Sequence, residues 1–301
     1  MNLEPSYLHR YEEIRQEGLK ALNNGSLDQA YELFDRAYQL AQRHGDEQLV
    51  DRAYCNRAAV AIEVGSPNDY LPALRRILTS HRDLENSRLA AYNIAQIYQL
   101  RKDYKKGLFY ARIARDLSVQ LDKAEWVASS HNRIGNLLLA ESYFDEAAQE
   151  YERALALFGP ELSLQRAILL ENVGYCRIVQ GHHDEGFRLL FDSLRGLRRL
   201  GARGFQVYPH LSLCYAYVEI DRPRHALRHG AHALILAQSF RNQDCSKYAY
   251  YLLGQACQLM GARDAARQYL LRLQEHFYPQ SPEIVDFLLA VDVHRMINIK
   301  A

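Results

Sequence analysis

Residues 131 to 158, HNRIGNLLLAESYFDEAAQEYERALALF, decide the fold of this chain. Gly135 and Leu138 share one face of a predicted helix, because residues three or four apart stack on the same side. Ala147 and Tyr151 share a face of a second predicted helix in the same way. Two antiparallel helices cross closely only where one side chain is small, and a larger residue then fills the next gap. The stretch therefore predicts a pair of helices that buries only part of its apolar surface and needs neighbours on both sides.

The same pattern recurs along the whole chain, with a small residue deep in the first helix of each predicted pair. These small residues are Gly18, Ala58, Ala95, Gly135, Gly174, Cys214 and Gly254. They lie 40, 37, 40, 39, 40 and 40 residues apart. The pattern resembles the tetratricopeptide repeat, in a form longer than the common period of about 34 residues. It is similar to the repeats of kinesin light chains, of the polarity adaptors that bind Goloco peptides, and of bacterial peptide-pheromone receptors.

The resemblance covers about residues 8 to 278 and implies an all-α fold. We expect a right-handed α-solenoid of about seven helix pairs, followed by a C-terminal capping helix over residues 281–301. The predicted array occupies residues 1–280, with repeats at 11–47, 48–84, 85–123, 124–162, 163–202, 203–242 and 243–280.

Composition and charge are those of an ordinary globular chain. Apolar residues make up 48% and charged residues 24%, and the formal net charge is +1, so the total favours neither nucleic acid nor membrane. The first 18 residues lack the apolar core of a secretory signal, and no run approaches the roughly 18 apolar residues of a membrane span. The five cysteines are an odd number without a CxxC, which argues against disulfides and zinc. We therefore expect small core cysteines and a cytoplasmic protein.

Clusters of charge and of histidine each have two interpretations. Basic residues gather between Arg188 and Arg228, and acidic residues gather in the first repeat. Both are interpreted as a solvated convex face, with a charge-selected docking site as the alternative. His225, His229 and His232 lie four and three residues apart, so one helix presents all three. A solvated histidine face is predicted, and a metal site is the alternative, although no carboxylate stands nearby to complete it.

The sequence carries no set of residues that is typical of catalysis. Nucleophile elbows, phosphate-binding loops, HExxH and paired CxxC motifs are all absent from it. We therefore expect no enzymatic activity, no cofactor and no metal.

Candidate partner-binding residues follow from the resemblance, since the first helix of each tetratricopeptide pair lines a concave groove. By helical phase, the predicted groove residues are Asn56, Tyr92, Asn93, Gln96, Asn132, Arg133, Asn136, Asn172, Tyr175, Tyr208, Leu211, Tyr215, Tyr251 and Gln255. Asparagine donates to and accepts from a peptide backbone, and tyrosine adds flat apolar area with a polar tip. The family commonly has asparagine at the positions of Asn56, Asn93 and Asn136, so part of the pattern belongs to the repeat itself. The carboxylate clamp of heat-shock partners would require Lys or Arg near Leu89 and at Asn93, and it is absent.

These features predict a protein–protein interaction module that acts as a scaffold or adaptor. It would bind an extended or helical segment of a partner protein in the groove, centred on repeats three to five, and neither nucleic acid nor membrane. The alternative is a peptide- or ligand-responsive regulator similar to the bacterial receptors. Those receptors carry an effector segment ahead of the repeats, whereas the first repeat here begins near Tyr11, so we expect no such segment.

Overall fold

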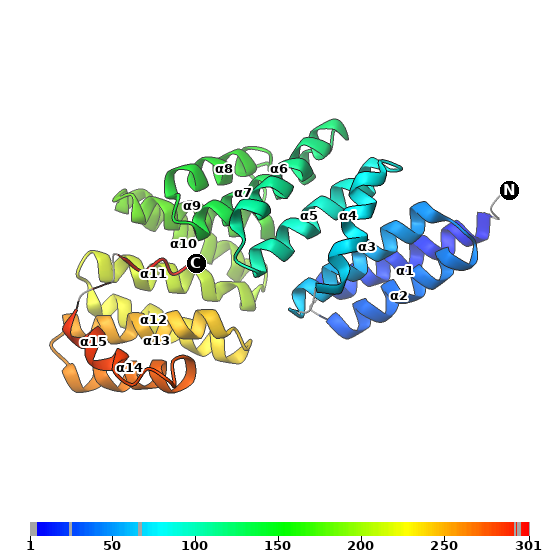
Figure 1. Ribbon diagram of the computed structural model, residues 1–301. Helices are drawn as coiled ribbons and strands as arrows, with labels where there is room; N and C mark the ends of the chain where they lie inside the picture. The colour runs from blue at the N-terminus through cyan, green and yellow to red at the C-terminus, as the bar shows by residue number, and fades with distance from the viewer. Residues whose placement is uncertain (1–4, 24–25, 66–67, 292, 294–295, 301) are drawn as a thin grey trace. The chain divides into compact units, whose positions relative to one another are not determined.

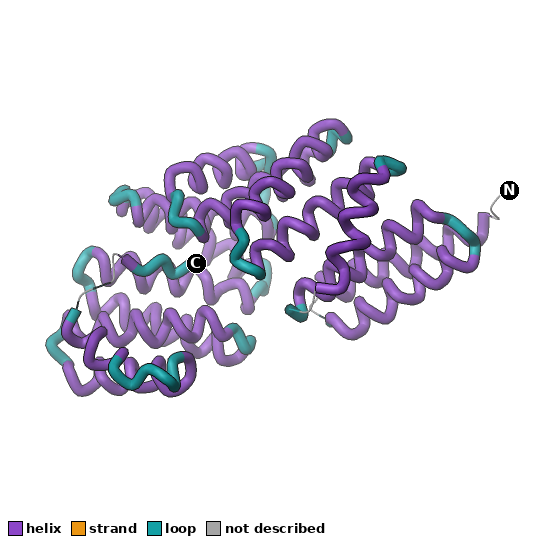
Figure 2. The backbone as a smooth tube through the Cα atoms, in the orientation of Figure 1, coloured by secondary structure: helices purple, strands orange, loops and turns teal. Residues whose placement is uncertain are grey.

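The fold is helical throughout the part of the chain that is described. A computed structural model describes residues 5–23, 26–65, 68–291, 293 and 296–300 (Figure 1). These residues form fifteen α-helices and two short 3-10 helices, and the ranges just given contain no strand (Figure 2). The all-α prediction, with seven consecutive helix pairs and a final helix, is confirmed. None of the helices in these ranges combines the length and the apolar character that a bilayer span requires.

The helix bounds are as follows. The α-helices are α1 (Pro5–Asn23), α2 (Leu27–Arg43), α3 (Glu47–Glu63), α4 (Leu71–Ser80), α5 (Leu84–Leu100), α6 (Tyr104–Gln120), α7 (Ala124–Ala140), α8 (Phe144–Ala156), α9 (Leu164–Val179), α10 (His183–Arg199), α11 (Val207–Glu219), α12 (Pro223–Ser239), α13 (Gln243–Leu259), α14 (Arg263–Phe277) and α15 (Ile284–Ala290). The 3-10 helices are η1 (Asn68–Tyr70) and η2 (Arg203–Gln206).

The chain divides into two compact units, and the division falls within α7. Unit 1 is Met1–Leu137 and unit 2 is Leu138–Ala301. In unit 1, α2 packs against α1 and α3, and α5 packs against α3, α4 and α6. In unit 2, α9 packs against α8, α10 and α11, and α13 packs against α11, α12 and α14. Each unit is therefore a stack in which helices contact near neighbours in sequence, as in other repeat proteins.

Close helix crossings occur where the sequence pattern places its small residues. In α1, a Cβ added at Gly18 would lie 2.6 Å from the ring of Phe34 in α2. In α13, a Cβ added at Gly254 would lie 2.9 Å from Leu270 in α14. Each contact joins the small residue to the residue sixteen positions later, so the register of the pairs follows from the sequence. All five cysteines are buried as free thiols, as predicted.

The turn inside the helix pair repeats regularly in repeats two to seven. The residue seven positions after the small residue adopts a left-handed backbone in repeats two to seven. These residues, with their φ angles, are Gly65 (76°), Lys102 (57°), Ser142 (64°), Gly181 (82°), Asp221 (53°) and Gly261 (72°). Glycine adopts this conformation without steric cost, whereas Lys102, Ser142 and Asp221 do so with a Cβ that crowds the backbone.

One boundary differs from the prediction, and one second helix is short. Helix α1 begins at Pro5, ahead of the predicted start at residue 11, and Tyr7 and Tyr11 are buried within it. The second helix of repeat two, α4, has only 10 residues, with a proline in its first turn, and follows η1 directly. Proline is tolerated at this place because its missing N–H would have no partner inside the helix.

The final helix is shorter than the capping helix predicted over 281–301. Helix α15 ends at Ala290, and Val291 is extended with φ −119° and ψ 124°. The β-branched Val291 and Val293 disfavour helix here because their side chains crowd the preceding turn. Helix α15 buries Val285 and Leu288.

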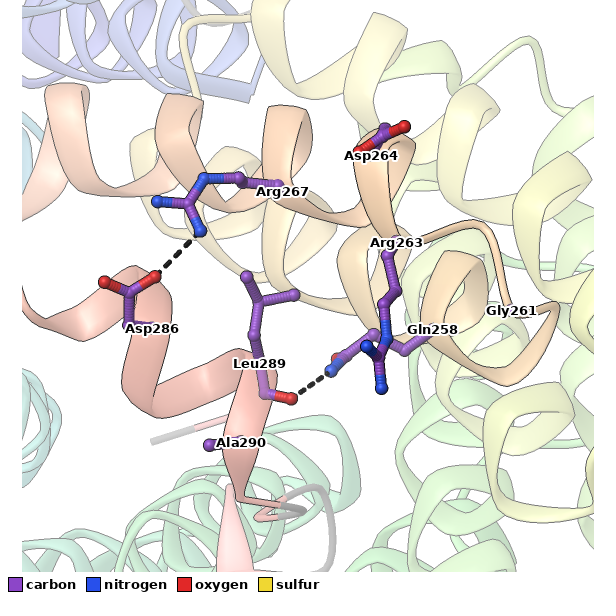
Figure 3. Close-up of a pocket in the computed structure, with 8 residues that line it drawn as sticks. All are labelled: Gln258, Gly261, Arg263, Asp264, Arg267, Asp286, Leu289 and Ala290. Atoms are coloured by element: carbon purple, nitrogen blue, oxygen red, sulfur yellow. Dashed lines mark hydrogen bonds and ion pairs between the residues drawn. The ribbon is translucent and has the colours of Figure 1, made fainter.

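Two polar contacts hold α15 at the end of unit 2. Arg267 of α14 forms an ion pair of 2.8 Å with Asp286, and the side chain of Gln258 in α13 donates to the Leu289 carbonyl at 3.1 Å (Figure 3). These residues border a shallow pocket that also includes Arg263. Helix α15 therefore lies against the last helix pair, α13 and α14.

Candidate functional site

Residues 296–300, which we call the tail segment, lie against the first helices of repeats five and six. Figure 1 shows the last described residues beside α11 rather than continuing from α15. Within the tail segment Ile299 is only 3% exposed, whereas Met296 is 83% exposed. All partners of the tail segment named below belong to unit 2. The segment is therefore anchored by its last residues, Asn298 to Lys300.

Asn298 is held by four hydrogen bonds. Its amide nitrogen donates to the Leu139 carbonyl at 2.6 Å and to the Ser142 hydroxyl at 3.2 Å. Its amide oxygen accepts from the Tyr175 hydroxyl at 3.3 Å and from the backbone N–H of Lys300 at 2.9 Å. Both ends of the amide are thus satisfied, which an aliphatic or acidic side chain of the same size could not achieve.

Lys300 forms a buried ion pair with Glu171 of α9. Its ammonium lies 2.7 Å from each carboxylate oxygen, and the two side chains are 12% and 4% exposed. Ser212 of α11 donates to the same carboxylate at 2.5 Å. The ammonium also lies 5.6 Å and 5.4 Å from the ring centres of Tyr175 and Tyr208. Burying an ion pair is favourable only when further groups satisfy both charges, and here a hydroxyl and two aromatic faces do so.

The tyrosines around the tail segment act as neutral donors and apolar walls. Tyr175 is fully buried, and burial raises its pKa well above the usual value, with a smaller contribution from neighbouring Tyr215. A backbone hydrogen bond with Ile299 opposes part of this rise in the pKa. Burial also raises the pKa of Tyr208 to about 12. The rings of Tyr175 and Tyr215 meet edge to face at 5.6 Å.

The asparagines predicted to line the groove differ in burial and in bonding. Asn93 is 4% exposed and its amide donates to the Cys55 carbonyl at 2.7 Å, which ties α5 to α3. Asn56 and Asn172 are both 7% exposed. Asn132 and Asn136 are half-buried on α7. The structure therefore uses Asn93 to join neighbouring repeats, because an amide packed between helices must satisfy a backbone carbonyl there.

Several of the other predicted groove residues have side-chain contacts within their own unit. In unit 1, Arg133 donates to Gln99 at 2.8 Å and to the Tyr92 hydroxyl at 3.1 Å, and its guanidinium covers the Tyr92 ring at 4.9 Å. In unit 2, Gln255 donates to Gln258 at 3.0 Å. The remaining members are half-buried Gln96 and buried Leu211 and Tyr251. Of the predicted set, only Tyr175 and Tyr208 have contacts with the tail segment among those given above.

Three residues of the site were missed by the sequence analysis: Ser142, Glu171 and Ser212. Glu171 precedes Tyr175 by four positions, and Ser212 follows Tyr208 by four, so each pair shares a helix face. That spacing was available in the sequence. The spacing alone did not identify a site, because Lys300, the cation that pairs with Glu171, lies in a stretch interpreted as a capping helix.

Of the three histidines predicted to form a solvated face, His225 and His232 are exposed as predicted, whereas His229 is half-buried. The Nδ1 atoms of His229 and of His210, which comes from α11, lie 3.0 Å apart, and His232 stacks on His210 at 5.1 Å. His225 stacks on Tyr217 at 5.0 Å. Burial lowers the pKa of His210 to about 3 and that of His229 to about 4. In the part of the chain that is described, no three His, Cys, Asp or Glu side chains are placed to hold a metal ion.

The basic stretch contains ion pairs within one helix. On α10, Arg195 pairs with Asp192, and Arg188 lies 4.0 Å from Glu185. Exposed pairs of this kind contribute about 0–1 kcal/mol, so they have little influence on the fold.

Comparison with known proteins gives partial sequence matches to FKBP6 from several mammals. No protein-family model matches the chain. The inactive peptidyl-prolyl cis-trans isomerase FKBP6 of Rattus norvegicus is 29% identical over 155 residues, which make up 52% of this chain and 36% of the relative. The match therefore spans little more than a third of that relative's length.

Solved structures define the class of fold. NprR in complex with its cognate peptide NprX has a TM-score of 0.70 at 13% identity, covering 96% of this chain and 83% of NprR. A tetratricopeptide repeat protein from Parabacteroides merdae has a TM-score of 0.55 at 16% identity, covering 95% and 99% of the two chains. The chain therefore has the tetratricopeptide-repeat fold that its sequence pattern predicted.

Proposed function

We propose that this chain is a protein–protein interaction module that holds a peptide segment of a partner protein against α9 and α11. The main support for the proposal is the tail segment. Its consecutive residues Asn298, Ile299 and Lys300 place an amide, an aliphatic and an ammonium group against hydrogen-bonding, apolar and acidic groups of unit 2. A segment of another chain with the same groups would find the same donors, acceptors and apolar walls. The solved NprR structure is described as a peptide complex, which is consistent with a fold of this kind holding a peptide.

The chemistry of the site favours a peptide over a nucleic acid or a catalytic substrate. The charge that α9 presents to the tail segment is the buried carboxylate of Glu171, which would repel phosphate, whereas nucleic-acid sites are lined by cations. The raised pKa of Tyr175 keeps that hydroxyl protonated, so it acts as a donor rather than as a base. We therefore propose a scaffold or adaptor rather than an enzyme.

A second candidate is a peptide-responsive regulator. The tail segment favours it, because an occupant that belongs to the chain can be displaced by a ligand and then moves. Asn132 and Asn136, which belong to unit 1, remain proposed partner contacts of that unit.

A full-length variant with a released tail tests the proposed function. Ile299→Asp with Lys300→Glu places two acids where a buried aliphatic side chain and an ion pair stand, so the tail should leave the site. The probe is a fluorescein-labelled synthetic peptide of residues 296–301, MINIKA, followed by fluorescence anisotropy. We expect saturable binding to this variant and weaker binding to the unaltered chain. Met296→Ser, at an exposed position, is the matched control and should behave as the unaltered chain does. A folded double variant that fails to bind the peptide would refute the proposal.

A further inference from the structure

We infer that the site on α9 and α11 selects a partner segment in which asparagine, an aliphatic residue and lysine follow one another, and that the tail segment competes with that partner. The inference rests on the proposed function and specifies the ligand of the same site. The occupant is a segment of another protein, and the tail segment is its intramolecular competitor.

The lysine is required because Glu171 is a buried acid. With its side chain 4% exposed, the carboxylate has Ser212 as a donor and the Lys300 ammonium as its counter-charge. A segment that brought a neutral side chain here would leave a buried carboxylate without a cation, which is costly. The ammonium approaches both carboxylate oxygens at 2.7 Å while it lies between the faces of Tyr175 and Tyr208. A compact point charge fits this place better than a planar guanidinium.

The asparagine is required because its side chain bonds to two acceptors, the Leu139 carbonyl and the Ser142 hydroxyl, and to one donor, the Tyr175 hydroxyl. Its amide nitrogen faces the Leu139 carbonyl in the last turn of α7, where the helix presents partial negative charge. Its oxygen faces the Tyr175 hydroxyl, which burial keeps protonated. Aspartate would set a carboxylate against the carbonyl and lose the donated hydrogen bonds. The position therefore discriminates between two side chains of nearly equal size by hydrogen bonding alone.

The aliphatic residue between them sets the spacing. Ile299 is 3% exposed, and its backbone bonds to the Tyr175 hydroxyl. Because Tyr175 contacts both Asn298 and Ile299, and its ring lies under Lys300, one fully buried side chain holds three consecutive residues of the segment. An insertion between asparagine and lysine would break this register.

Competition by the tail segment would reduce the apparent affinity of a partner. A short tether gives the tail an effective concentration of about 1 mM at the site. If the tail binds with a Kd of about 0.1 mM, it lowers the apparent affinity of a partner about tenfold. A tighter partner segment, or one with further contacts outside the site, would displace the tail.

Peptide selectivity on the released-tail variant of the full-length chain tests the inference. MINIKA is compared with two peptides that carry Met in place of Lys or Asp in place of Asn, by the same anisotropy assay. We expect each substitution to weaken binding at least tenfold. Adding Glu171→Gln to the protein should reduce the preference for lysine to less than threefold, whereas Glu161→Gln, at an exposed site, should leave it unchanged.

The outcomes separate the two proposals. If no peptide binds, the proposed function fails. If all three peptides bind with equal affinity, or if Glu171→Gln leaves the lysine preference intact, the module binds peptides but the inferred selectivity is wrong. If the unaltered chain binds MINIKA as tightly as the variant does, the tail segment is no competitor.

Discussion

The ion pair between Lys300 and Glu171 should measurably stabilise unit 2. Lys300→Met keeps the length of the side chain and removes the ammonium. If the tail stayed in place, breaking a buried pair would cost about 3–5 kcal/mol, because Glu171 would remain buried without a counter-charge. If the tail instead detached, Glu171 would regain water, and the loss would be limited to the free energy of docking the tail. A hydrogen bond to a charged group contributes about 1.5–3 kcal/mol, and we expect a loss of about 2 kcal/mol.

A double-mutant cycle with Glu171→Gln isolates the contribution of the pair. Urea unfolding followed by circular dichroism gives the free energy of unfolding for the four proteins. We expect the double variant to be more stable than the sum of the single losses predicts, by about 1–2 kcal/mol, since glutamine needs no counter-charge. Lys247→Met is the control, because the Lys247–Asp244 contact is long, at 3.9 Å, and its acid is 89% exposed. Additive effects of the two substitutions would refute the pair as described.

Three further predictions concern packing, acidity and the end of the array. Gly186→Ala should lower the free energy of unfolding by about 1–3 kcal/mol in urea titrations, since the added Cβ would lie 2.6 Å from Ile178, whereas Gly159→Ala meets no atom within 4 Å and should be neutral. Burial lowers the pKa of His210 to about 3, so between about pH 6.5 and pH 3 only the unfolded state binds a proton at this side chain. The free energy of unfolding should therefore be full above pH 6.5 and fall by about 2 kcal/mol by pH 5. His210→Gln should reduce this fall, as measured by thermal melts at pH 7.5 and 5. Deleting residues 283–301 should expose apolar surface and cause self-association in light scattering, while deleting residues 296–301 should leave a monomer; equal behaviour of the two deletions would show that α15 is no cap.

The helices could be predicted from the sequence because their determinants are local and repeat. The spacing of small residues fixes both the face of each first helix and its partner sixteen positions later, as at Gly18 and Phe34. The shortness of α15 could not be predicted in this way. Apolar residues continue past Ala290 to Ile299, and a helical pattern alone does not say that Ile299 is buried against another part of unit 2.

The site could be predicted only in part, because a helix face is visible in sequence and its occupant is not. Tyr175 and Tyr208 were found from helical phase. Lys300 and Glu171 are 129 positions apart, and no local pattern relates residues at that separation. Asn93 was also found from helical phase, but its amide donates to the Cys55 carbonyl between two helices. The amide predicted to bind a partner therefore joins two helices of the chain. Residue type and phase therefore predict where an amide lies more reliably than what it bonds to.

Ser142 shows how a turn residue in such repeats can gain a side-chain contact at little structural expense. Its left-handed backbone, with φ 64°, is a position that Gly181 and Gly261 fill in other repeats. Glycine there would relieve a conformational cost of roughly 1 kcal/mol, but it would remove the hydroxyl that meets Asn298. Stability and recognition thus make opposite demands on one turn residue. Because repeats two to seven present this turn at the same place, exchanging single turn residues offers protein engineers a way to add or remove side-chain contacts while the helices stay unchanged.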